Sequence, residues 1–304
     1  LPEGWSYREA TALALDSHDN LHVFNRGSHP MIVLDPDGNV LRTWGEGSFV
    51  NPHGVAIGPD DSVYCVDFGD HTVRKFTPEG TLLMTIGAPG RPALPMSGDP
   101  FSSPTHVAID SRNGNLYVSD GYGNARVHKY SPDGRHLLSW GESGTDEGQF
   151  SVPHNITTDK DGWVYVADRE NQRIQIFDEN GRFEAQWGLN LSRPACVDVK
   201  HVAAEKLAYV GEFFGGFVTN STGMRLGPRI SILDGDGNVL ARLGDQTFGH
   251  GAGRFYSPHA IAVDRRGDIY VAEVPVTESY GGLIPPLTDP AEERRSLQKL
   301  VKRA

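Results

Sequence analysis

The chain has 304 residues, of which 38% are hydrophobic and 22% are charged, a globular composition that excludes an intrinsically disordered chain. Its formal net charge of −11 would repel a phosphate backbone, so we expect no nucleic-acid partner. The sequence holds no run of about 20 apolar residues and no signal peptide at its start, so we expect no membrane partner.

One phrase recurs about every 50 residues, and its copies begin near Ala10, Asn51, Ser103, Val152, Arg193 and Ser257. The clearest copy reads VPHNITTDKDGWVYVADRENQRIQIFDENGRFEAQWG and ends at Gly188. Each copy contains short segments of alternating apolar residues, separated by turns such as DPDG and SPDG. Four-stranded units at this period are typical of β-propeller blades. The sequence therefore predicts an all-β protein, a single six-bladed β-propeller over residues 1–304.

The sixth copy offers a third strand at Leu297–Lys302 but no fourth. We expect the opening segment Trp5–Tyr7 to supply that strand and to close the ring. The Trp-Gly pairs that close several copies are expected to pack between blades, and the Asp of the YVAD phrase to cap a turn. These phrases resemble NHL repeats.

Histidine occupies one position of the repeat in every second copy. That position, two residues before the apolar pair opening the first strand, holds Thr11, His53, Thr105, His154, Ala195 and His259. The first strand of a blade lines the central channel, and alternate blades are related by a rotation of about 120°. Three neutral imidazoles around an open fourth position are the ligands of catalytic zinc. We expect zinc, or another divalent transition metal, on the three histidines; the alternative is that they line the channel and bind water.

Two neighbours of these histidines are candidates for the layer of residues around the metal site. His106 lies one position later in its own copy, and Ser257 stands two residues before His259. The remaining eight histidines share no register and are interpreted as surface or packing residues. Cys65 and Cys196 lie far apart in the sequence, so we expect no disulfide framework.

The ends of the second strands are predicted to lie above the histidines. Aligning VFNRG with VADRE makes Arg26 and Arg169 equivalent, and SDGYGN places Tyr122 on the same rim. Arginine binds carboxylates through two parallel hydrogen bonds, and a phenol near cations loses its proton more easily. The alternative for Arg169 is a salt bridge between blades that involves Glu170.

Three longer connections are predicted to emerge on the histidine face and to act as lids or walls: Ala88–Phe101, Glu212–Pro228 and Val274–Ala291. We expect their aromatic residues Phe213, Phe214, Phe217 and Tyr280 to provide apolar contacts there.

These segments resemble peptidyl-α-hydroxyglycine α-amidating lyase, the second catalytic half of the peptide-amidating enzyme. The similarity covers most of the chain and is carried by FNRGSH, PHGVAI, SDGYGNARV, FSVPHNI, VADRENQRIQIF and SPHAIAV. The resemblance implies zinc on the three register histidines. It further implies that Tyr122 is the general base on the substrate hydroxyl and that Arg26 and Arg169 place the substrate carboxylate. The family reaction cleaves the N–C bond of a carbinolamide to give an amide and glyoxylate.

The chain departs from the family at five positions. The family has a calcium-binding aspartate where this chain has Ala260, which argues against calcium. Ser257 replaces a methionine of the pocket wall, and Gly123, Tyr165 and Ile176 stand where the family has disulfide cysteines. The missing cysteines and the lack of a signal peptide favour a cytoplasmic location.

The interpretation that these patterns favour is a zinc-dependent lyase acting on a small α-hydroxy-amide carboxylate. A second interpretation keeps the three-histidine site but makes it a hydratase or hydrolase of another small carboxylate or amide. A third, from a different class, is a non-catalytic NHL scaffold that binds protein and no metal.

Overall fold

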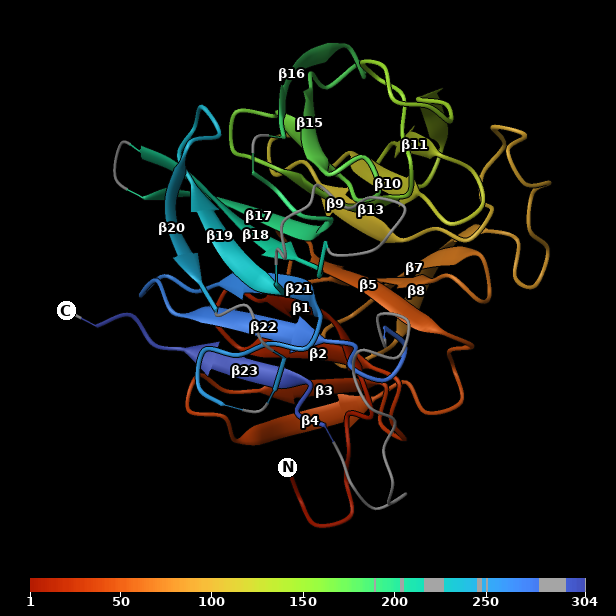
Figure 1. Cartoon of the computed structure of the whole chain (residues 1–304). Helices are drawn as coiled ribbons and strands as arrows, with labels where there is room; N and C mark the ends of the chain where they lie inside the picture. The colour runs from red at the N-terminus through yellow and green to blue at the C-terminus, as the bar shows by residue number, and fades with distance from the viewer. Residues whose placement is uncertain are drawn as a thin grey trace.

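The computed structural model describes residues 1–188, 190–202, 205–215, 227–244, 248–249, 251–278 and 294–303. In these residues the chain forms five four-stranded sheets and one three-stranded sheet, all antiparallel, arranged as the blades of a propeller (Figure 1). The predicted all-β, six-bladed architecture is confirmed. Among the described residues, no helix is long and apolar enough to cross a membrane.

The first three blades consist of β1 (Ala10–Leu15), β2 (Leu21–Asn25), β3 (Met31–Leu34) and β4 (Val40–Trp44); β5 (Pro52–Ile57), β6 (Val63–Asp67), β7 (Thr72–Phe76) and β8 (Leu82–Gly87); and β9 (His106–Ile109), β10 (Leu116–Asp120), β11 (Arg126–Tyr130) and β12 (His136–Trp140). The last three consist of β13 (Pro153–Thr158), β14 (Val164–Asp168), β15 (Arg173–Phe177) and β16 (Phe183–Trp187); β17 (Pro194–Val202), β18 (Glu205–Glu212), β19 (Arg229–Leu233) and β20 (Val239–Leu243); and β21 (Pro258–Val263), β22 (Ile269–Glu273) and β23 (Leu297–Leu300).

The first strand of each blade lines the centre of the ring. Strands β1, β5, β9, β13, β17 and β21 contact one another in that order, and β21 contacts β1 again. The first and last blades are therefore neighbours, as Figure 1 shows for β21 and β1. This arrangement brings the starts of all six inner strands to one mouth of the central channel.

The sixth blade corrects one expectation. Its third strand, β23, forms where Leu297–Lys302 predicted it, but Trp5–Tyr7 is not a strand and does not join the sheet. Trp5 instead stacks on His29, with ring centroids 3.9 Å apart, and Tyr7 packs against the same first-blade core. Packing against this core partly removes these rings from water without a strand pairing.

The Trp-Gly ends pack between blades, as expected. Trp140, at the end of blade three, lies against Gly181, in a turn of blade four. A Cβ atom at Gly181 would sit 2.6 Å from Cδ2 of Trp140, and the φ of Gly181 is +79°, a conformation that favours glycine. Trp44 and Trp187 meet Gly80 and Gly237 of their next blades in the same way.

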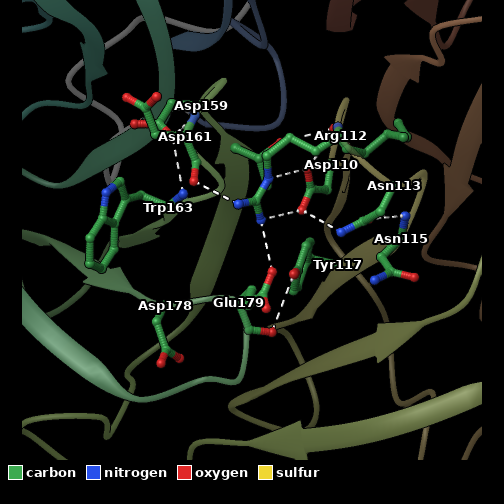
Figure 2. Close-up of polar contacts among 12 residues, drawn as sticks. Asp110, Arg112, Asn113, Asn115, Tyr117, Asp159, Asp161, Trp163, Asp178 and Glu179 are labelled. Atoms are coloured by element: carbon green, nitrogen blue, oxygen red, sulfur yellow. Dashed lines mark hydrogen bonds and ion pairs between the residues drawn. The ribbon is translucent and has the colours of Figure 1, made fainter.

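An arginine joins blades three and four where their first strands end, on the side away from the histidines. Figure 2 shows its contacts. Arg112 donates from Nη2 to Asp110 at 2.8 Å and to Glu179 at 2.9 Å, and from Nη1 to the carbonyl of Asp161 at 2.8 Å. Asp110 belongs to blade three, whereas Asp161 and Glu179 lie in turns of blade four. The guanidinium therefore links three turns of two blades, away from the mouth.

Candidate functional site

The three register histidines meet on the channel axis. His53, His154 and His259 are buried near the starts of β5, β13 and β21, and their ring centroids lie 5.0, 4.7 and 4.6 Å apart. Each offers one possible ligand atom, and these atoms all lie within 4.8 Å of one another. The repeat spacing therefore predicted their convergence.

Each histidine is oriented by the following blade. Every Nδ1 lies 2.6 Å from the carbonyl oxygen at the equivalent position of the next blade: His53 on Thr105, His154 on Ala195, and His259 on Thr11. A carbonyl oxygen only accepts hydrogen bonds, so each Nδ1 carries the proton and each Nε2 keeps a free lone pair. This is how metal-binding histidines are held in proteins.

The imidazoles are also held neutral. Burial lowers the pKa of His53 and His154 well below 6.5, and lowers that of His259 to about 3. Arg26 and Arg169 contribute to this lowering because a nearby positive charge disfavours a second one. All three side chains are therefore ready to bind a cation near neutral pH.

Tyr122 completes the centre. Its hydroxyl lies 2.9 Å from Nε2 of His53 and 2.9 Å from Nε2 of His154. Tyr122 is 39% exposed overall, but its hydroxyl lies between the two imidazoles. Burial raises the pKa of Tyr122, and the positive charges of Arg169 and Arg26 oppose that rise.

The donor set fits a divalent transition metal. The hydroxyl of Tyr122 has one proton, so it can donate to only one of the two Nε2 atoms that it faces. At the second Nε2 atom, a lone pair of the hydroxyl oxygen faces the lone pair of the nitrogen, which is repulsive. A cation bound between these atoms would remove the repulsion. Three neutral nitrogen donors with an open fourth position match a catalytic zinc site.

A second cluster of possible ligands lies at the far end of the channel, and we assign no metal to it. Asp159, Asp161 and His201 bring ligand atoms within 4.8 Å of one another. However, Nζ of Lys206 lies 2.7 Å from Oδ2 of Asp159, so this carboxylate is already neutralised. Asp159 also accepts a hydrogen bond from the hydroxyl of Tyr165.

Arg26 lies on the rim, as the register predicted. Its Nη1 donates to Oε2 of Glu9 and to Oγ1 of Thr277, both at 2.9 Å. Its guanidinium carbon lies 5.9 Å from the centroid of the Phe68 ring. The Nε of Arg26 is buried and has no hydrogen-bond partner among the residues that the structure describes. This arginine therefore keeps a donor for an anionic group.

Arg169 takes part in the salt bridge between blades that the sequence offered as the alternative, and it also lies beside Tyr122 on the rim. Its Nε donates to Oε1 of Glu170 at 2.8 Å, and Glu170 also binds Nη2 of Arg193 in the next blade at 2.8 Å. The guanidinium carbon of Arg169 also lies 5.8 Å from the centroid of the Tyr122 ring. The salt bridge between blades thus holds Arg169 beside the phenol.

Aromatic rings line the mouth, and the sequence interpretation missed one of them. Phe213 was expected there, and its centroid lies 6.2 Å from those of His154 and His259. Phe68 was not expected, yet its ring lies 5.5 Å from that of His53 and 5.4 Å from that of Tyr122. Comparing the position that directly follows the second strand of each blade would have identified Phe68. That position holds Arg26, Phe68, Gly121, Arg169, Phe213 and Val274.

Of the other aromatic residues that were expected at the mouth, Phe214 is the one among the described residues. Phe214 is buried and contacts Phe248, with centroids 5.4 Å apart. Phe217 and Tyr280 lie outside the described residues.

His106 and Ser257 adjoin the site. His106 lines a channel of about 230 Å³ to which all six inner strands contribute, and its Cδ2 lies 2.9 Å from where a Cβ of Gly54, the residue after His53, would be. Burial lowers the pKa of His106 to about 4. Ser257 is fully buried, and its amide donates to Glu273. Cys65 and Cys196 are buried free thiols, in agreement with the sequence.

Comparison with known proteins agrees with this architecture. The NHL repeat model matches residues 49–76, 101–130 and 150–177. In the solved structures, a gluconolactonase from Xanthomonas campestris has a similar fold, with a TM-score of 0.60 and 15% identity over 88% of this chain and 84% of that one. A likeness at this identity shows the fold alone.

Three curated relatives extend the comparison. NHL repeat-containing protein 3 of Mus musculus is 31% identical over 86% of this chain and 76% of its own length. Peptidyl-alpha-hydroxyglycine alpha-amidating lyase 1 of Drosophila melanogaster is 33% identical over 80% and 47%. Peptidyl-glycine alpha-amidating monooxygenase B of Xenopus laevis is 31% identical over 87% of this chain, which spans 33% of that protein. The chain therefore belongs to the NHL-repeat proteins, as a member similar to the peptidyl-α-hydroxyglycine α-amidating lyases.

Proposed function

We propose that the protein is a zinc-dependent lyase that cleaves the N–C bond of an α-hydroxy-amide carboxylate. The observation that carries this proposal is the position of the Tyr122 hydroxyl, 2.9 Å from Nε2 of both His53 and His154. A group able to take a proton is thereby held at the point where the imidazole lone pairs converge. Similarity to the amidating lyases supports the same chemistry.

The metal would be held by Nε2 of His53, His154 and His259. When bound, a divalent cation supplies positive charge that polarises the substrate oxygen and favours the phenolate form of Tyr122. The carbonyl groups of Thr105, Ala195 and Thr11 fix the three imidazoles through Nδ1, so the site is pre-organised.

Tyr122 would move one proton twice. Its phenolate takes the proton of the substrate hydroxyl, the carbon–oxygen bond becomes a double bond, and the C–N bond breaks. The phenol then returns the proton to the departing amide nitrogen. The products are a primary amide and glyoxylate, so the step needs neither water nor an oxidant.

The two rim arginines would bind the substrate carboxylate. Arg26 keeps a buried Nε without a partner among the described residues, and Arg169 lies beside the ring of Tyr122. Charge-assisted hydrogen bonds from guanidinium to carboxylate are strong and directional. They would place the substrate with its hydroxyl at Tyr122.

One observation favours a hydratase or hydrolase as the second candidate. Burial raises the pKa of Tyr122, which favours the neutral phenol over the base. In that case the phenol would orient or donate to the substrate, and an activated water would attack a carboxylate derivative or an amide.

The test is turnover of N-acetyl-α-hydroxyglycine by the zinc-loaded protein, with acetamide and glyoxylate measured by chromatography. We expect equal amounts of the two products. Replacing Tyr122 by Phe should lower kcat by about 10²–10⁴-fold while one zinc per chain is retained. The control is Tyr117→Phe. The Tyr117 hydroxyl donates to the backbone carbonyl of Glu179, in a turn remote from the three histidines (Figure 2).

Two results would contradict the proposal. Unchanged turnover in Tyr122→Phe would remove the phenol from the reaction and favour attack by water. No stoichiometric metal in the wild-type protein, even after zinc is supplied, would favour the non-catalytic scaffold.

A further inference from the structure

A recess between blades one and two adjoins the candidate site. It has a volume of about 380 Å³ and is lined by Arg8, Glu9, Asn25, Arg26, Gly27, Pro30, Phe49, Val50, Asn51, Pro52, Phe68, Val276 and Thr277. Sites for small molecules commonly enclose about 300–1,000 Å³. The recess is therefore large enough for one substituent of a substrate.

Phe68 lies between the recess and the candidate site formed by the histidines and Tyr122. Its ring lines the recess and lies 5.5 Å from the ring of His53 and 5.4 Å from that of Tyr122. Arg26 lines the recess as well, with its guanidinium 5.9 Å from the Phe68 ring. A molecule whose carboxylate is bound by Arg26 thus has the recess directly beside it.

Part of the lining of the recess is apolar and exposed. Val50 is 70% exposed and Val276 is 45% exposed, and both line the recess together with the rings of Phe49 and Phe68. Apolar side chains that gather at the edge of a functional site are typical of ligand-binding surfaces. They would be removed from water by an apolar substituent of a bound substrate.

Two polar groups of the recess are paired within the protein. The carboxylate of Glu9 binds Arg26 and accepts hydrogen bonds from the amides of Val276 and Thr277. The side-chain amide of Asn25 donates to backbone carbonyls, including that of Pro30 at 3.1 Å. Arg8 also lines the recess and is exposed, so the recess combines a positive edge with apolar walls.

The loop Ala88–Phe101 lies beside Tyr122. The amide of Met96 donates to the carbonyl of Gly123, the residue after Tyr122, and the side chains of Met96 and Leu94 are exposed. The loop therefore borders the mouth, and its role as a wall stays a prediction.

We propose that this recess binds the substituent on the amide side of the substrate and selects larger apolar acyl groups over small ones. The inference rests on the proposed lyase function for the identity of the substrate. The recess provides apolar walls at Val50, Val276 and Phe68, beside the arginine that would hold the carboxylate.

The test uses N-acylglycines, which carry the carboxylate and the amide but lack the reacting hydroxyl. Isothermal titration of the zinc-loaded protein should show that N-hexanoylglycine binds about tenfold or more tightly than N-acetylglycine, because each buried methylene adds affinity.

Two variants locate the effect. Val50→Asn and Val276→Asn, which add no charge beside Arg26, should each reduce the hexanoyl-to-acetyl preference severalfold, mainly by weakening the binding of N-hexanoylglycine. The matched control is Leu240→Asn, at an exposed apolar residue on the outer strand β20, which should keep the full preference. A wild-type protein without the preference, or both mouth variants retaining it, would overturn the inference.

The α-hydroxy forms of the same compounds separate this inference from the proposed function. The recess is supported if the wild-type protein prefers N-hexanoylglycine to N-acetylglycine and the recess variants lose that preference. If no α-hydroxy compound is cleaved in the same experiments, only the lyase proposal fails. If the hexanoyl and acetyl α-hydroxyglycines are cleaved with equal kcat/KM in the wild type, the recess inference fails and the lyase proposal stands.

Discussion

Nδ1 of His259, near the start of the last blade, donates to the carbonyl of Thr11 in the first blade at 2.6 Å, across 248 positions of sequence. This contact joins the two blades that close the ring and also orients one candidate metal ligand. The other two histidines depend on their next blades in the same way. Binding of a metal by the three histidines would therefore be coupled to closure of the ring, because the imidazoles are positioned only when neighbouring blades are in contact.

Removing one imidazole should remove the metal. We expect His154→Ala to lose stoichiometric zinc, since two nitrogen donors and a phenol are a poor replacement for three imidazoles. Elemental analysis of the purified protein measures this directly. His106→Ala is the control, because His106 lies beside the site but outside the converging group, and it should retain one zinc per chain. Equal zinc in both variants would contradict the site.

Acid should destabilise the metal-free protein through these histidines. Burial holds the pKa of His53 and His154 well below 6.5 and that of His259 at about 3 in the folded chain, whereas in the unfolded chain they titrate near 6.5. The unfolded chain therefore binds more protons as the pH falls below 6.5. The free energy of unfolding should fall by up to about 1.4 kcal/mol per pH unit for each histidine.

Urea titrations of the metal-free protein at pH 7, 6 and 5 measure this dependence. A variant in which all three histidines are replaced by glutamine should show a shallower decline over the same range. Identical pH slopes for the two proteins would mean that the imidazoles accept protons in the folded state.

Glu9 should act as a positioning residue for Arg26. Glu9→Gln keeps the size of the side chain but removes the charge that binds Nη1 of Arg26. We expect KM for a carboxylate substrate to rise about tenfold with a smaller change in kcat, because the arginine binds the carboxylate and not the reacting hydroxyl. Steady-state kinetics separate the two parameters.

The control is Glu46→Gln, which alters a half-exposed glutamate that binds His29 in the same blade. It should leave KM unchanged. An unchanged KM in Glu9→Gln, with metal content and fold intact, would show that Arg26 does not need this carboxylate.

Arg112 should contribute to stability and not to activity. Its guanidinium joins turns of blades three and four, and Asp110, one of its partners, is fully buried. Arg112→Ala should lower the free energy of unfolding by about 1 kcal/mol, after allowance for the partly exposed guanidinium. Thermal unfolding and turnover measure the two effects. Arg265→Ala, which removes a largely exposed pair with Asp19, should cost less. A loss of turnover in Arg112→Ala would contradict a structural role.

The repeat pattern alone predicts the number of blades, the histidines of alternate blades and the rim positions of Arg26, Tyr122 and Arg169. These features depend on a repeat and its register, and a repeat of strands forces equivalent residues into equivalent places. The prediction of three converging imidazoles needed no knowledge of any contact between distant segments.

The groups that these residues touch could be identified only after the chain was folded into blades. The carbonyl partners of the three histidines, the ion pair of Arg26 with Glu9, and the recess beside Phe68 all join segments that are remote in sequence. Trp5–Tyr7 failed as a strand for the same reason, because Trp5 found a partner in His29. Side-chain contacts between blades depend on packing in three dimensions, and a one-dimensional repeat does not encode which distant side chain fills each space.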